Sequence, residues 1–340
     1  GNRGSTPRNF MTGNNKLYFS ASTPEHGNEL WCYEHSSGIL ERLTDINPGS
    51  DSSNPQELIM FHNKIYFQAY TAAYGKELYE YNPSSKVVRL VADIIKGPVG
   101  SIAKKPIVFN NKLYFVAFTY AYGVELYSYD GTFQPVRVTD LAPGPADGVC
   151  VDCEMATLND KLYFTGNGDL YRYDPVSDKI ALADKMGFSS SCNVVCYNNA
   201  LYFDGYEFNT TDHELWKFDG TRATRITNFS KNTGVWNLAA TSHAIFFSAR
   251  SEVIGTELFR YSEYPLSVGN TTSKTTISLY PNPTQDIAHL QLKLSNAHAL
   301  SISVTDINGR TVFTKPNTLY SAGKHTIDIP MHNLPQGNYL

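Results

Sequence analysis

The stretch from Ile65-Tyr66-Phe67 to Glu77-Leu78-Tyr79 decides the fold, because the chain carries five further copies of it. Each copy is an aromatic strand, a variable loop, and an acidic residue followed by leucine and an aromatic residue. The other copies begin with Leu17-Tyr18-Phe19, Leu113-Tyr114-Phe115, Leu162-Tyr163-Phe164, Leu201-Tyr202-Phe203 and Ile245-Phe246-Phe247. They end with Glu29-Leu30-Trp31, Glu125-Leu126-Tyr127, Asp169-Leu170-Tyr171, Glu214-Leu215-Trp216 and Glu257-Leu258-Phe259. A period of roughly forty to fifty residues built from strands is typical of a β-propeller.

The second copy shows how many strands each repeat contributes. Apolar and polar residues alternate over residues 58–62, 64–69, 77–81 and 86–93, and Gly, Pro, Asn and Asp mark the turns between such segments. Four short antiparallel strands per repeat make one propeller blade. We therefore expect an all-β protein in which residues 1–268 form a β-propeller, and the six visible copies favour six four-stranded blades.

The ends of this propeller are less regular than its middle. In the sixth copy, only residues 264–268 could form a fourth strand. Either that segment or a segment upstream of the first copy would then supply the strand that closes the ring. A larger ring with further upstream blades is the alternative interpretation.

The composition suits an all-β protein and argues against some partners. Aromatic residues make up 13% of the chain and charged residues only 18%, and broad rings pack well between β-sheets. The formal net charge of -4 gives no electrostatic reason to expect nucleic acid as a partner. No apolar run approaches the roughly 18 residues that a membrane-spanning helix needs.

A second, smaller domain follows the repeats. Residues 269–276 are rich in Ser and Thr and lack apolar periodicity, which is typical of a linker. Residues 277–340 then contain strand-like segments at 288–294, 300–306, 311–314 and 325–329. Asn308-Gly309 between two of them is a hairpin signal. We expect a small immunoglobulin-like β-sandwich that is incomplete at its C-terminus.

Two copies of the repeat resemble a known bacterial pattern. Glu214-Leu215-Trp216 is followed by Asp219-Gly220-Thr221, and Glu125-Leu126-Tyr127 by Asp130-Gly131-Thr132. This resembles the bacterial β-propeller repeat whose consensus reads Glu-Leu-Trp-x-x-Asp-Gly-Thr. The resemblance implies the fold and says nothing about an activity.

The C-terminal segment resembles the type A C-terminal sorting domain of the type IX secretion system of Bacteroidota. Three motifs carry this resemblance in the family's order: Tyr280-Pro281-Asn282-Pro283, the segment from Val304 to Val312, and Leu334-Pro335-Gln336-Gly337-Asn338-Tyr339. The resemblance implies export through the periplasm and the outer membrane of a Gram-negative bacterium, to the cell surface or the medium. The implied partners are the type IX translocon and its outer-membrane shuttle and attachment proteins.

The same resemblance implies which residues the secretion machinery recognises. They are Pro281, Asn282, Pro283, Asp306, Gly309, Arg310, Gly337 and Tyr339. An alternative interpretation is that Pro, Gly and Asn at these positions shape the turns of the sandwich.

The repeated acidic residue before leucine offers a first candidate site in the propeller. A ring of six carboxylates could bind a cation. A structural role is the expected alternative, because a carboxylate that accepts backbone N–H bonds at the blade edge would recur in every blade. We therefore expect no metal and no cofactor.

Aromatic residues in the loops between the second and third strands offer another candidate site. In the second and third copies these residues are Tyr70, Tyr74, Phe118, Tyr120 and Tyr122. Such loops share one face of a propeller with the linkers between blades. The rings could stack on sugars or contact a protein there, or they could pack between neighbouring loops.

Four cysteines cluster in the middle of the chain: Cys150, Cys153, Cys192 and Cys196. In an exported protein, disulfides are favoured over a zinc site. Cys153 and Cys192 hold the same register in adjacent repeats, whereas strand residues four apart, such as Cys192 and Cys196, are separated by about 13 Å. Bonds between the fourth and fifth blades are therefore favoured. Cys32 is expected to be a buried free thiol.

No motif for catalysis is present. The chain has no Gly-x-Ser-x-Gly sequence, no His-Glu-x-x-His sequence and no glycine-rich phosphate loop. We predict an exported, non-enzymatic protein whose propeller binds a surface polymer, a glycan or a protein in adhesion. The alternatives are a secreted polysaccharide-binding or polysaccharide-degrading propeller enzyme, and a propeller that is passive cargo of the secretion system.

Overall fold

The computed structural model describes residues 4–185, 193–206, 213–229, 234–251, 255–263, 277–280, 286–305, 311–332 and 334. The chain divides into two compact units, Gly1–Glu263 and Tyr264–Leu340. The linker expected at 269–276 and the candidate strand at 264–268 both lie outside the described residues. No helix occurs in the described ranges, so none of them holds a helix long and apolar enough to cross a membrane.

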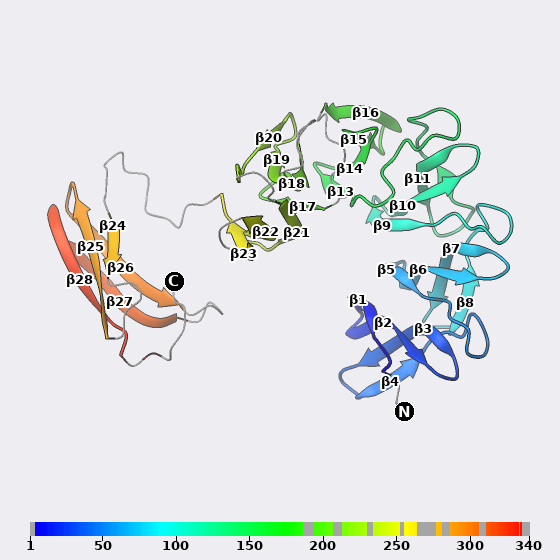
Figure 1. The fold of residues 1–340 in the computed structure, drawn as a ribbon, viewed down its shortest axis with the longest axis horizontal. Coiled ribbons are helices and arrows are strands. Elements are labelled where there is room, and N and C mark those ends of the chain that lie inside the picture. Colours follow the sequence, from blue (N-terminus) through cyan, green and yellow to red (C-terminus); the bar gives the residue numbers. More distant parts are fainter. Residues whose placement is uncertain are drawn as a thin grey trace. The chain divides into compact units, whose positions relative to one another are not determined.

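The described part of the first unit consists of six antiparallel sheets in chain order (Figure 1). The first three blades are β1 (Arg8–Gly13), β2 (Lys16–Thr23), β3 (Gly27–Glu34) and β4 (Ile39–Arg42); β5 (Gln56–Phe61), β6 (Lys64–Thr71), β7 (Gly75–Asn82) and β8 (Val87–Leu90); and β9 (Lys104–Phe109), β10 (Lys112–Thr119), β11 (Gly123–Tyr129) and β12 (Val136–Arg137). The next three are β13 (Ala156–Leu158), β14 (Lys161–Gly166), β15 (Asp169–Asp174) and β16 (Lys179–Asp184); β17 (Val194–Tyr197), β18 (Ala200–Gly205), β19 (Glu214–Phe218) and β20 (Ala223–Arg225); and β21 (Gly234–Ala240), β22 (Ile245–Ser251) and β23 (Gly255–Tyr261). The predicted all-β fold with four-stranded blades is confirmed.

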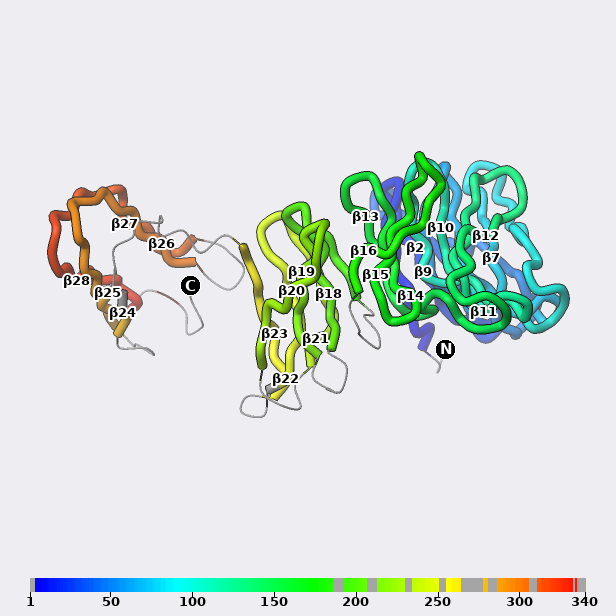
Figure 2. The backbone as a smooth tube through the Cα atoms, turned by 90° about the horizontal axis from the view of Figure 1, so that it is seen from above, coloured from blue at the N-terminus to red at the C-terminus, as the bar shows by residue number. Residues whose placement is uncertain are grey.

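Within each blade, neighbouring strands pair in sequence order. Five sheets have four strands and the sixth has three in the part of the chain that the structure describes. The first strands of neighbouring blades contact one another in the pairs β1 with β5, β5 with β9, β13 with β17, and β17 with β21. The fifth and sixth blades lie side by side in both views (Figure 1, Figure 2). This sequential, radial packing of small sheets is the arrangement of propeller blades.

The turn between the first two strands of five blades is built from two residues in the left-handed region. These pairs are Asn14-Asn15, His62-Asn63, Asn110-Asn111, Asn159-Asp160 and Asn198-Asn199, with φ between 44° and 60°. Two consecutive residues of positive φ define the tight hairpin turn whose twist matches that of the flanking strands. Asn, Asp and His tolerate this conformation better than other non-glycine residues, which explains why this dipeptide recurs.

Cores form between blades, not within one blade. Tyr18, Leu30 and Cys32 of the first blade pack against Ile65 and Phe67 of the second. Equivalent clusters join the second blade to the third, the third to the fourth, the fourth to the fifth and the fifth to the sixth. One blade cannot bury both of its faces by itself, so each depends on its neighbours.

The second unit is a small two-layer β-sandwich, as expected. One sheet contains β24 (Ile277–Tyr280), β25 (Ile287–Leu294) and β28 (Gly323–Pro330), and the hairpin of β26 (His298–Thr305) and β27 (Thr311–Tyr320) forms the other. Ala288, Val304 and Ile329 pack between the two sheets.

The left-handed turns predict how a hairpin responds to substitution. Asn110 has a φ of 44° and is exposed. Asn110→Val places a β-branched residue in a conformation that costs roughly 1–2 kcal/mol, so the free energy of unfolding in urea should fall by about that amount. Asn110→Gly is the control and should change it little. Equal losses for both variants would contradict the turn assignment.

Candidate functional site

The carboxylate of the Glu-Leu motif holds the chain that leaves its own blade. Glu77, which is fully buried, accepts hydrogen bonds from the Ser101 backbone nitrogen at 2.9 Å, the Ser101 Oγ at 2.5 Å and the Ile95 nitrogen at 3.3 Å. Glu29 accepts one from Thr44 Oγ1 at 2.7 Å and one from the Ile46 nitrogen at 3.3 Å. Both carboxylates therefore bind the linker to the next blade.

The third and fifth blades repeat this contact. Glu125 accepts hydrogen bonds from Thr139 Oγ1 and from the Leu141 nitrogen at 3.1 Å. Glu214 accepts them from Thr227 Oγ1 at 2.5 Å and from the Phe229 nitrogen at 2.8 Å. The contacts of these four carboxylates fit the structural role expected for them. Across the described ranges, no group of three or more His, Cys, Asp or Glu residues is arranged to hold a metal ion.

Burial under the linkers changes the ionisation of these groups. Burial raises the pKa of Glu77 from 4.5 to about 7, partly offset by the hydrogen bonds from Ser101 and Ile95. Burial also raises the pKa of Glu125. A raised carboxyl pKa often marks a catalytic acid, but here each carboxyl group points into its own linker.

The Asp-Gly-Thr part of the repeat forms the turn after the third strand. Asp130 Oδ1 accepts hydrogen bonds from Thr132 N and Oγ1, both at 2.8 Å, and Asp219 Oδ1 does the same with Thr221 at 2.8 and 2.6 Å. These bonds lower the pKa of Asp219 to about 2. An aspartate that bonds the backbone two residues ahead forms an Asx-turn, so this motif is also structural.

The aromatic candidates lie on the face that carries the linkers. The chain at Lys76 forms a bridge with Gly100, and the Ser101 carbonyl accepts a hydrogen bond from the Phe118 nitrogen at 2.8 Å. The linker around Val99 therefore runs between the β6–β7 loop, which holds Tyr74, and the end of β10. A Cβ atom at Gly75 would lie 2.5 Å from Gly100 N, so only glycine permits this close approach.

Several large apolar side chains are exposed along this seam. Tyr120 is 64% exposed, Val99 51% and Tyr74 41%. The Phe118 ring lies edge-on to the Tyr120 ring, and their centroids are 5.4 Å apart. We call Tyr74, Val99, Phe118 and Tyr120 the seam patch. It crosses from the second blade to the third.

The two remaining aromatic candidates flank the seam patch. The Tyr122 ring lies beneath the Arg137 guanidinium, whose Cζ is 3.7 Å from the ring centroid, a cation–π contact. The Tyr70 carbonyl accepts a hydrogen bond from Asn47 Nδ2 at 2.9 Å, and its nitrogen donates to the Ser53 carbonyl. Both rings are about two-fifths exposed. Each is tied to the linker face and still presents part of its surface to solvent.

A second set of side chains joins the inner strands. Asn9, Glu57 and Lys105 hold the same register and have φ of 55°, 56° and 51°, each beside a register shift of its strand. The side chain of each of these three residues contacts the next blade. Asn9 Nδ2 donates a hydrogen bond to the Pro55 carbonyl at 3.0 Å, and Glu57 Oε2 accepts one from the Lys105 backbone nitrogen at 3.1 Å. Lys105 Nζ forms an ion pair with Glu154 at 2.8 Å. A bulge that repeats at one register thus connects four blades.

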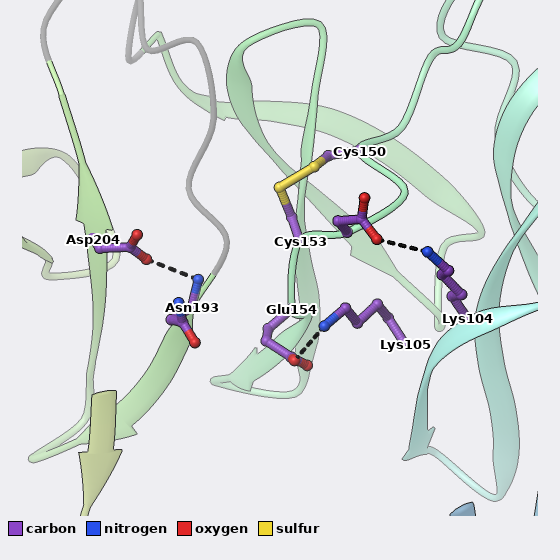
Figure 3. The surroundings of a disulfide bond; sticks show 8 residues. Lys104, Lys105, Cys150, Cys153, Glu154, Asn193 and Asp204 are labelled. Atoms are coloured by element: carbon purple, nitrogen blue, oxygen red, sulfur yellow. Dashed lines mark hydrogen bonds and ion pairs between the residues drawn. A yellow bond between two sulfur atoms is a disulfide. The ribbon is translucent and has the colours of Figure 1, made fainter. Parts of the chain in front are cut away.

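The ion pairs at the fourth blade lie beside a disulfide. Figure 3 shows Lys105 paired with Glu154, and Lys104 Nζ lies 2.7 Å from Asp152 Oδ1. Cys150 and Cys153 are bonded to each other across this short segment, with Cα atoms 5.4 Å apart. The disulfide closes the short loop that holds Asp152, and Glu154 directly follows it.

The predicted disulfide exists, but the favoured pairing between blades is wrong for Cys150 and Cys153. The equivalent positions of Cys153 and Cys192 in adjacent repeats predicted that Cys153 lies on an inner strand. In the structure, β13 begins only at Ala156, and the chain before it bends. Cys196 is an exposed free thiol, and Cys32 is a buried free thiol as predicted. Cys192 lies outside the described residues.

The structure does not describe the residues that the secretion machinery is expected to recognise. Pro281, Asn282, Pro283, Asp306, Gly309, Arg310, Gly337 and Tyr339 all lie outside the described residues. Their recognition role stays a prediction.

The sequence did not reveal Val99 or the bulge residues Asn9, Glu57 and Lys105 as parts of the site. The constant spacing of the bulge before the aromatic strands of the first three blades is the signal that could have revealed these bulge residues.

Comparison with known proteins identifies the C-terminal unit. Residues 278–340 match the family described as a secretion system C-terminal sorting domain. No curated protein matches the chain. The chain is therefore cargo of the type IX secretion system, and export takes it to the cell surface or into the medium.

Comparison with solved structures supports the propeller fold alone. A prolyl endopeptidase matches 91% of the chain with a TM-score of 0.57 and 11% identity, and the match covers 53% of that protein. The extracellular domain of a one-component system from B. thetaiotaomicron matches 94% of the chain with a TM-score of 0.51 and 16% identity, over 41% of that structure. The chain thus spans about half the length of the structures it matches. At such low identity, neither activity carries over.

The raised pKa of Glu77 predicts a dependence of stability on pH. Because the folded state favours the protonated carboxyl group, its contribution to stability is complete below pH 4.5 and is lost as the pH rises to about 7. Glu77→Gln should remove this decline when unfolding by urea is compared at pH 4.5 and pH 7.5. Glu257→Gln, at the exposed equivalent position in the sixth blade, should leave the decline unchanged. An unaltered decline in Glu77→Gln would contradict the assignment.

Proposed function

We propose that the first unit is a non-enzymatic binding domain that attaches the exported chain to a surface glycan or polymer through the seam patch. The observation that carries this proposal is the exposure of Tyr74, Val99 and Tyr120 on loops and a linker that backbone contacts join, with the Phe118 ring against Tyr120. Large aromatic and aliphatic side chains rarely gather on a solvent-facing loop surface without a binding role.

The chemistry of the patch favours a sugar. A pyranose ring presents an apolar face of C–H groups, and an exposed tyrosine offers a flat ring for stacking and a hydroxyl for hydrogen bonding. The glycines and linker bonds beneath the patch fix its backbone, so little entropy is lost when a ligand binds. Arg137 above Tyr122 adds polar donors at the edge of the patch.

The carboxylates support binding over hydrolysis. Hydrolysis of a glycosidic bond usually needs two carboxyl groups that face each other across the substrate. Glu77 and Glu125 instead hold their own linkers. Asp152 and Glu154 are solvent-exposed and paired with lysines.

The test is a depletion assay of the whole chain on a panel of insoluble polysaccharides. The double variant Tyr74→Ala and Tyr120→Ala should weaken binding by about tenfold or more, since loss of aromatic anchors costs at least 1–2 kcal/mol. Phe133→Ala is the matched control, because Phe133 is 79% exposed and lies in the turn between the third and fourth strands.

Three results would contradict the proposal. Wild-type protein that binds no polysaccharide would remove the glycan as the ligand. Equal losses in the double variant and in Phe133→Ala would place the ligand elsewhere. Release of reducing ends from a bound polysaccharide would show that the domain is an enzyme.

A further inference from the structure

The leucine of the Glu-Leu motif has one environment in five blades and another in the sixth. Leu30, Leu78, Leu126, Leu170 and Leu215 are between 0% and 4% exposed. Leu258, at the same position, is 72% exposed. The sequence of the motif is the same, so the difference lies in what covers it.

In the first five blades, the next blade covers this leucine. Leu30 packs with Ile65 and Phe67 of the second blade, and Leu78 with Leu113 and Phe115 of the third. An aromatic pair accompanies each contact from the second blade onward. The ring centroids of these pairs are 5.5 to 5.9 Å apart. The pairs are Tyr66–Tyr129, Tyr114–Tyr173, Tyr163–Phe218 and Tyr202–Tyr261.

The sixth blade presents this same face uncovered. Phe246 holds the position of those tyrosines and is only half-buried, and Arg260 is exposed beside Leu258. The opposite face of the sixth blade is closed, since Ile245 and Ala249 are fully buried against the fifth blade. The middle strand of the sixth blade is thus covered on the side of the fifth blade, whereas Leu258 and Arg260 are exposed on the side that a following blade would cover.

The first blade is uncovered on the complementary face. Leu17 and Phe19 are half-buried, whereas their equivalents Ile65 and Phe67 are 0% exposed. Phe10 is 60% exposed. An open depression on this blade is lined by Leu17 and Tyr33 together with Thr12, Gly13, Asn14, Asn15, Lys16 and His35. Tyr33 holds the strand position at which Tyr129 and Tyr173 contact an aromatic ring of the preceding blade.

We propose that a further blade of the same repeat type occupies the sector between the sixth and first blades. Its motif leucine and central tyrosine cover Leu17, Phe19 and Tyr33, and its own aromatic strand covers Phe246 and Leu258. The five internal interfaces specify this occupant, because both open faces repeat the residue types of faces that blades cover elsewhere in the chain. Direct contact of the sixth blade with the first is disfavoured, since both faces stay exposed although all five internal interfaces are formed.

The test adds one blade to the chain. A copy of residues 1–48 is placed in register before Gly1, so that its Tyr18 and Leu30 face the original first blade. The unfolding temperature should rise by about 4 °C or more, because a new apolar interface forms. The matched control carries Leu30→Asp and Tyr18→Ser in the added copy alone and should show no rise. Equal unfolding temperatures for the two extended chains would overturn the proposal.

Two measurements on the unaltered chain separate the other occupants. Hydroxyl-radical footprinting should label Phe10 and Leu258 in the monomer as strongly as the exposed Phe133. Protection of both in a monomer would show that the sixth blade docks directly on the first, and would overturn the proposal. Light scattering should give the monomer mass across concentrations. A concentration-dependent dimer that protects Phe10 and Leu258 would make a second copy the occupant and would also overturn it.

Discussion

The packing of one leucine against the next blade is the contact on which the rest of the propeller depends. A four-stranded sheet of this size cannot bury both faces alone, and the Glu-Leu motifs of the first, second, third and fifth blades supply two contacts that solve this problem. Leucine is covered by the aromatic strand of the following blade, as for Leu78 against Phe115. The neighbouring glutamate binds the linker that leads to that blade, as for Glu77 and Ser101. One dipeptide thus fixes both the packing and the path of the chain.

This arrangement also produces the surface on which function is proposed. Because the linkers are held at the ends of the second and third strands, side chains from consecutive blades become neighbours there. Val99 belongs to a linker, and Tyr74 and Tyr120 belong to loops of different blades. The bridge between Lys76 and Gly100 joins this linker to the second blade, and the hydrogen bond from the Phe118 nitrogen to the Ser101 carbonyl joins it to the third. A binding surface on a secretion cargo can then vary by loop substitution while the motif keeps the scaffold constant.

Much of the fold could be predicted from the sequence, because repetition averages out local ambiguity. The strands of the second copy were expected at 58–62, 64–69, 77–81 and 86–93 and are found at Gln56–Phe61, Lys64–Thr71, Gly75–Asn82 and Val87–Leu90. The cysteine pairing was missed because the three-residue β13 is short and the chain before it departs from the repeat. Val99 was missed because no pattern in a linker reveals its exposure. The uncovered faces at Leu258 and Leu17 look the same in sequence as covered ones, so only the structure distinguishes them.

Amide hydrogen exchange across the six blades tests most directly whether packing on the next blade stabilises each repeat. The account predicts slow exchange in the third strands β3, β7, β11, β15 and β19, whose leucines are covered, and markedly faster exchange in β23, whose Leu258 is 72% exposed. Protection of β23 equal to that of β7 and β11 would contradict it, because the blades would then be stable without a following neighbour.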